Sequence, residues 1–250
     1  MKSLEKSETT DDAPRSFRVE DDSSEHFELG ESVYGLMFIA PYSSWHFAYA
    51  IVVYLLKMAL FYFLGNQVLS RCKDDMESCI SKQDEKEVYW ARFCLTPVAL
   101  AIQEDLIYVY THLYKIKYDK TLVEHEQTKA ATLFKFFLSF FLRFTDGFVS
   151  LLINFALLLT TSDILAMFLN FAALEFLQGV DDLAFELGAF GYLGDKMDER
   201  CAVVKRTVLL KRTSHKWSDS LDTVLFLSTL VCMYVGWLCV YLREEKMSGS

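Results

Sequence analysis

The chain has 250 residues, of which 52% are hydrophobic and 15% aromatic, and its formal net charge is −9 at pH 7. Long apolar blocks argue against an ordinary soluble domain, and an acidic chain without a basic face argues against nucleic-acid binding. With only 3 prolines and 10 glycines, long helices are favoured over the alternating strands of a β-barrel. We therefore expect an all-α, polytopic membrane helical bundle.

The N-terminal residues 1–32 are rich in Ser, Thr, Asp and Glu and nearly lack apolar residues until the end of the segment. This composition is typical of a disordered tail. A short apolar stretch at 33–40 follows and ends at Pro41, and it has the length of an anchor in the membrane interface. The membrane domain is expected to cover 33–242, followed by a short C-terminal tail at 243–250.

About 20 predominantly apolar residues are needed to cross a bilayer, and five stretches come close to this length. The predicted spans are 45–65, 93–114, 139–161, 163–187 and 223–242. Ser162 or Asp163 is a suitable N-cap between the third and fourth spans, so these two spans should form a tight hairpin. The last span contains no charged residue.

Basic residues in the short loops predict the orientation of the spans. The loop after the second span and the loop after the fourth span are both rich in Lys and Arg, which places them and the N-terminus on the cytoplasmic side. The loop between the first two spans would then lie on the opposite side. It holds Cys72 and Cys79, a possible disulfide in an oxidising compartment.

Ionisable residues at membrane depth are costly and often mark function. The basic ones are Lys57 and Arg143, and the acidic ones are Glu104, Asp105, Asp146, Glu175, Asp181, Asp182 and Glu186. Counting residues from the ends of the predicted spans places Lys57 level with Glu104, Asp105 and Glu175, because straight helices rise about 1.5 Å per residue.

Two sets of residues follow from this count. The candidate cation or proton site comprises Glu104, Asp105, Glu175 and Asp182, and the candidate ion-pair partners are Lys57, Arg143, Asp146 and Asp181. Lys57 is expected to neutralise Glu104 or Glu175, and Arg143 to pair with Asp181 or Asp182. An alternative places Arg143, Asp146, Asp181 and Asp182 at the cytoplasmic interface, where hydration makes charges inexpensive.

The fourth predicted span carries the pattern LNF-A--F----DD-AF, which begins at Leu169 and ends at Phe185, after the Ser162–Asp163 turn. This element resembles one found in a family of uncharacterised polytopic membrane proteins of diatoms and other stramenopile algae. The resemblance implies a membrane location and a special role for the fourth helix. It implies no particular activity.

Three classes of function remain open from the sequence. Excess acid at membrane depth favours a cation channel or transporter subunit, while a network of structural ion pairs would suit a non-transporting scaffold or assembly subunit. An enzyme is disfavoured: Asp181, Asp182 and Glu186 form only an imperfect acidic motif, and no HExxH, GxSxG or P-loop occurs. We expect no cofactor, leave any metal unassigned, and expect as partners the lipid bilayer, inorganic cations and further subunits, whether identical or different.

Overall fold

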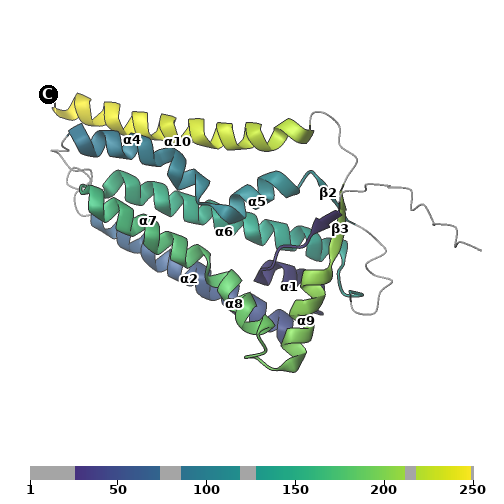
Figure 1. The fold of residues 1–250 in the computed structure, drawn as a ribbon. Helices are drawn as coiled ribbons and strands as arrows, with labels where there is room; N and C mark the ends of the chain where they lie inside the picture. Colours follow the sequence, from purple (N-terminus) through teal and green to yellow (C-terminus); the bar gives the residue numbers. More distant parts are fainter. Residues whose placement is uncertain (1–25, 74–85, 119–127, 212–217, 249–250) are drawn as a thin grey trace, which may run out of the picture.

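The computed structural model describes residues 26–73, 86–118, 128–211 and 218–248. They form an elongated helical bundle with a small sheet at one end (Figure 1). The elements are β1 (His26–Glu28), α1 (Val33–Ile39), α2 (Trp45–Lys73), α4 (Lys86–Ala101), α5 (Glu104–His112), β2 (Ile116–Lys117), α6 (Leu133–Thr160), α7 (Ile164–Gln178), α8 (Val180–Ala189), α9 (Asp195–Arg206), β3 (Val208–Lys211) and α10 (Ser218–Ser248). The predicted all-α membrane bundle is confirmed.

Among the described residues, four helical stretches are long and apolar enough to cross a membrane, namely Trp45–Ser70, Leu133–Thr160, Ile164–Ala189 and Ser220–Leu242. A fifth crossing is possible if α4 and α5, which are bent by 56° relative to each other, act as one span. Helix α6 lies in the middle of the bundle and contacts α1, α2, α4, α5 and α7, while α10 packs on α4 and α5. These are the helices of an integral membrane protein.

The third and fourth spans form the predicted hairpin. Only residues 161–163 separate α6 from α7, and the Asp163 carboxylate accepts a hydrogen bond from the Ala166 backbone N–H at 2.9 Å. This side chain satisfies one of the N–H groups that every helix leaves free at its start. The hairpin is therefore fixed by local chemistry that the sequence displays.

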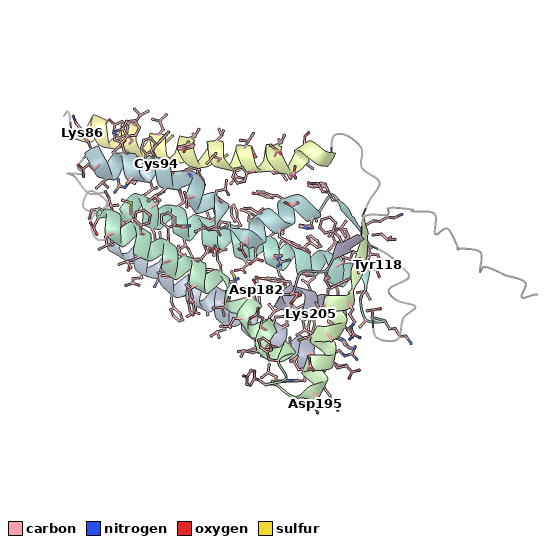
Figure 2. The ribbon with its side chains drawn as sticks, viewed as in Figure 1. Lys86, Cys94, Tyr118, Asp182, Asp195 and Lys205 are labelled. Atoms are coloured by element: carbon pink, nitrogen blue, oxygen red, sulfur yellow. The ribbon has the colours of Figure 1, made fainter. Side chains whose placement is uncertain are left out.

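The second span differs from the prediction because it is not one continuous helix. Lys86 and Tyr118 lie at opposite ends of the bundle (Figure 2), so α4 and α5 together run its full length. Pro97 has no N–H to offer the Phe93 carbonyl, which instead accepts a hydrogen bond from the Tyr234 hydroxyl at 3.2 Å. At the break itself, the Ala99 carbonyl accepts from the side chain of Gln103.

A glycine on α6 allows the second half of this span to approach. A Cβ added at Gly147 would lie 2.6 Å from the backbone nitrogen of Leu106 in α5. No larger residue fits there without moving a backbone. An irregular backbone at membrane depth is tolerated where protein buries it or where it lines a water-filled cavity. Here the close packing of α5 on Gly147 of α6 buries it.

The small sheet at one end of the bundle was not predicted. Its strand order is β1-β3-β2, and both pairings are antiparallel. It joins the segment before α1 to the loops that follow the second and fourth spans, so these three segments lie at the same end, as the charge distribution indicates. Which end faces the cytoplasm stays a prediction.

The boundary of the N-terminal tail also differs from the prediction. Residues 1–25 lie outside the described part of the chain, but residues 26–32 form β1 and the turn into α1. Leu29 and Ser32 are buried, and Leu29 donates its N–H to the Thr207 carbonyl at 3.1 Å. Backbone pairing with β3 orders this segment in spite of its polar composition.

Helix α1 is enclosed by protein and is not the lipid-facing anchor that the sequence predicts. All seven of its residues are buried, and they pack against α2, α6, α8 and α9. A short apolar stretch has the same composition in either position. Here the surrounding helices enclose it on every side.

Candidate functional site

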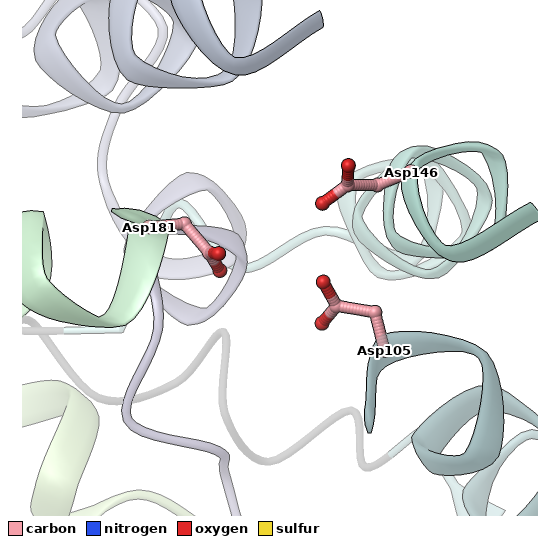
Figure 3. A group of neighbouring side chains, drawn as sticks. All are labelled: Asp105, Asp146 and Asp181. Carbon is pink, nitrogen blue, oxygen red and sulfur yellow. The ribbon is translucent and has the colours of Figure 1, made fainter. Parts of the chain in front are cut away.

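Charged residues from four helices meet inside the bundle. We call Lys57 of α2, Asp105 of α5, Arg143 and Asp146 of α6, and Asp181 of α8 the charge cluster. Its three aspartates turn their carboxylates toward a common point (Figure 3), and one oxygen from each lies within 4.8 Å of the others. Buried charges need partners, and the cluster supplies them across helices that are far apart in sequence.

Lys57 occupies the centre of the cluster. Its Nζ lies 2.6 Å from Asp146 Oδ2, 2.6 Å from Asp181 Oδ1 and 3.3 Å from Asp105 Oδ2. It also donates to the backbone carbonyl of Gln178 at 2.8 Å. Because only 1% of its surface is exposed, the ammonium group depends on these four acceptors in place of water.

Arg143 pairs with the third aspartate from the other side. Its Nε donates to Asp105 Oδ1 at 2.7 Å, and its Nη2 donates to the Ser32 hydroxyl at 3.3 Å. The guanidinium also lies 3.7 Å from the ring centroid of Tyr108, a cation–π contact. Both oxygens of Asp105 are therefore engaged, one by Arg143 and one by Lys57.

Asp146 and Asp181 are only half satisfied. Asp146 Oδ2 accepts from Lys57 and from the Tyr34 hydroxyl, while Asp181 Oδ1 accepts from Lys57. The other oxygens, Asp146 Oδ1 and Asp181 Oδ2, are buried without a hydrogen-bond partner. Such orphaned atoms are rare in proteins and call for an explanation.

The formal charges of the cluster do not balance. Three aspartates against one lysine and one arginine leave one negative charge in excess. Part of this charge is offset by helix geometry, because Asp105 lies in the first turn of α5, where the helix dipole stabilises anions. A dipole offers partial compensation, and the site still favours one further positive charge.

Two interruptions of helical structure meet at the cluster. One is the 56° bend between α4 and α5 at Gln103, and the other is a slight irregularity at Gly179, where α7 passes into α8 with the backbone still in the helical region. The side chains beside them are joined, because Gln178 Nε2 lies 2.5 Å from Gln103 Oε1 and 2.6 Å from Ser150 Oγ. Discontinuous helices in membrane proteins commonly surround binding sites.

An open groove lies beyond the cluster, toward the α6–α7 hairpin. Its volume is about 570 Å³, and its lining includes Leu64, Gln67, Thr160, Asp163 and Asn170. Phe61, Ile153 and Leu174 form a buried apolar cluster of their own, which we call the apolar layer.

Three neighbouring helices present the same order of residues from the groove to the cluster. The order is Leu64, Phe61, Lys57 on α2; Leu157, Ile153, Ser150 on α6; and Asn170, Leu174, Gln178 on α7. These steps of three or four residues are single helical turns, about 5 Å each. One layer of apolar side chains thus separates the groove from the polar site.

The structure separates the residues of the candidate cation or proton site. Asp105 belongs to the charge cluster, and Asp182 is half-buried beside it, whereas Glu104 and Glu175 are exposed on the surface of the bundle. Counting depth along straight helices gave the level of each residue but not the direction in which its side chain points. The break before α5 sends Asp105 inward and its neighbour Glu104 outward.

The predicted pairings change for the same reason. Lys57 contacts Asp105, Asp146 and Asp181 instead of Glu104 or Glu175, and Arg143 pairs with Asp105 instead of Asp181 or Asp182. Asp146 and Asp181 are buried, so the alternative of a hydrated interface does not apply to them. The possible disulfide involves Cys79, which lies outside the described residues, as does the side chain of Cys72.

Several polar residues of the site were missed from the sequence. Tyr34 lies on the helix expected at the interface, and Ser150 lies in an apolar tract, so neither was among the predicted site residues. A signal was present on α6, where the buried polar residues Ser139, Asp146, Ser150 and Asn154 follow at intervals of seven, four and four. Such spacing keeps them on one helix face, and a polar face at membrane depth turns toward protein.

Comparisons with protein-family models, with curated proteins and with solved structures found no match. The likeness of the fourth span to the algal membrane proteins stays a prediction.

Proposed function

We propose that this protein transports an ion across the membrane and that the charge cluster is its ion-binding site. The excess negative charge of the cluster, together with the orphaned oxygens of Asp146 and Asp181, is the observation that carries the proposal. Removing one partner of a buried ion pair costs about 3–5 kcal/mol, because an uncompensated charge is left inside the protein. An ion-pair network that only stabilised the fold would be expected to contain equal numbers of positive and negative charges.

The surroundings of the cluster support a transport cycle. The groove approaches the cluster from one end of the bundle, and the apolar layer closes the remaining distance. Separation of Phe61 and Leu174 by rocking of α2 against α7 would connect the groove with Lys57. The bend between α4 and α5 at Gln103 lies beside the cluster, and broken helices surround the ion sites of many transporters.

A scaffold with structural ion pairs is the second candidate. It is favoured by the close pairing of Lys57 with Asp146 and Asp181 at 2.6 Å and by their near-complete burial. In that case, substitution of Asp146 would weaken the fold without changing the passage of any ion.

Ion flux into vesicles distinguishes the two candidates. The purified protein is reconstituted into liposomes, and flux is recorded under imposed gradients of K⁺, Ca²⁺ or H⁺ for the wild type and for Asp146→Asn. Asp198→Asn is the matched control, because Asp198 is exposed on α9, outside the predicted spans. Glu104→Gln and Glu175→Gln test the exposed carboxylates in the same assay.

Transport predicts that the wild type and Asp198→Asn pass at least one of these ions and that Asp146→Asn loses this flux at least tenfold. A folded wild type that passes none of the three ions would contradict transport and favour the scaffold.

A further inference from the structure

We infer that the ion held by the charge cluster is a single proton, bound by the carboxylate pair Asp146 and Asp181. The inference rests on the proposed transport function and specifies its substrate. It follows from three features of the site, namely the free oxygens, the place of the lysine ammonium and the charge count.

The free oxygens limit where a proton can bind. Both oxygens of Asp105 already accept hydrogen bonds from cationic groups, one from Arg143 and one from Lys57. Asp146 Oδ1 and Asp181 Oδ2 have no partner and can each take a proton without displacing a donor. Both carboxylates also share Lys57 as a partner, at 2.6 Å each, so we assign the proton to the pair and not to either aspartate alone.

The lysine ammonium takes the place that a metal ion would need. Lys57 Nζ lies between the three carboxylates, at 2.6–3.3 Å from an oxygen of each. Ca²⁺ requires roughly 6–8 oxygen ligands, and Mg²⁺ near-octahedral coordination, so either ion would have to displace the ammonium from the three carboxylates. A proton adds no volume and leaves Lys57 where it is.

The charge count gives the number of protons. The charged and titratable groups around the cluster are Tyr34 from α1, Tyr54 and Lys57 from α2, Asp105 and Tyr108 from α5, Arg143 and Asp146 from α6, and Asp181 and Asp182 from α8. The two cations, Lys57 and Arg143, are both paired with aspartates of the cluster. Within the cluster as defined, one proton cancels the single negative charge in excess. Asp182 stands outside this count, because it is half-buried and neither Lys57 nor Arg143 pairs with it.

Infrared spectroscopy tests for the bound proton without any ion gradient. A protonated carboxyl group has a carbonyl stretch that a carboxylate lacks, and the area of this band counts protonated groups. The protein is studied in lipid nanodiscs at neutral pH, in a background of Glu104→Gln, Glu175→Gln, Asp182→Asn and Glu186→Gln. These changes remove the other carboxyl groups of the α5 start and of α7–α8.

We expect one carboxyl band in this background, its loss with either Asp146→Asn or Asp181→Asn, and no change with Asp198→Asn. Lys57→Met should roughly double the band, because a second proton is then needed to restore neutrality. Absence of the band in the background protein overturns the inference, and so does a band that survives both aspartate substitutions. Whether the carboxyl band is present is decided by the background protein alone, even if a further variant fails to fold.

The infrared spectra and the flux assay can each reject one proposal without rejecting the other. A vesicle flux of K⁺ or Ca²⁺ without a carboxyl band would leave transport standing and reject the proton. A band without flux under any gradient would keep the proton site and reject transport.

Discussion

Replacement of Lys57 by Met tests whether the ammonium holds the bundle together. The methionine fills a similar volume but removes the only described donor to Asp181 and one of two donors to Asp146. The formal charge of the cluster falls from −1 to −2. Breaking a buried pair from one side costs about 3–5 kcal/mol, which corresponds to at least a hundredfold rise in the unfolded fraction.

A double-mutant cycle measures the interaction free energy between Lys57 and Asp181 directly. Adding Asp181→Asn to Lys57→Met returns the charge to −1 and removes the carboxylate left without a partner, so about 1–3 kcal/mol of the loss should be regained. The assay is equilibrium unfolding in mixed micelles, followed by circular dichroism. Lys205→Met is the matched control, because Lys205 pairs with Glu31 at the surface and such pairs contribute about 1 kcal/mol or less.

The reasoning would be refuted if Lys57→Met were as stable as Lys205→Met, or if the Lys57 and Asp181 substitutions were additive. Either result would mean that the cluster does not hold its charges in the arrangement described.

Further substitutions test the surrounding structure. Gly147→Ala should cost about 1–3 kcal/mol in unfolding experiments, because its Cβ would press on the Leu106 backbone at 2.6 Å; Gly65→Ala, where the nearest atom is 3.6 Å away, should be tolerated. Asp163→Ala should cost about 0.5–2 kcal/mol through loss of the α7 N-cap, and Asp163→Asn should retain most of the stability. Burial raises the pKa of the Cys201 thiol to about 11, so thiolate is scarce at neutral pH, and mass spectrometry should find Cys201 alkylated only after unfolding.

The spans and the hairpin follow from the sequence because their causes are local. Apolar length determines which segments can cross a bilayer, and the cap at Asp163 acts within three residues of chain. The excess of acid at membrane depth was also visible in the sequence. Four residues of the charge cluster were expected to form ion pairs, and Asp105 was expected at an ion site.

The choice of partners required the tertiary structure. Lys57 contacts residues 48, 89 and 124 positions away along the chain, and the direction of each side chain depends on helix rotation and on the two interruptions. The break at Gln103 turns Asp105 inward and Glu104 outward, and Gly147 allows α5 to come close enough for the contact. Packing of distant segments determines these features.

The difference between local sequence signals and tertiary packing also explains the outcomes for α1 and for the sheet. The sequence by itself determined that 33–40 is apolar and that the chain before it is polar, since both are matters of composition. Only the tertiary structure decided that α1 is enclosed by α2, α6, α8 and α9 and that β1 pairs with β3. Burial and strand pairing depend on surfaces contributed from elsewhere in the chain, and neither leaves a periodic signal in so short a segment.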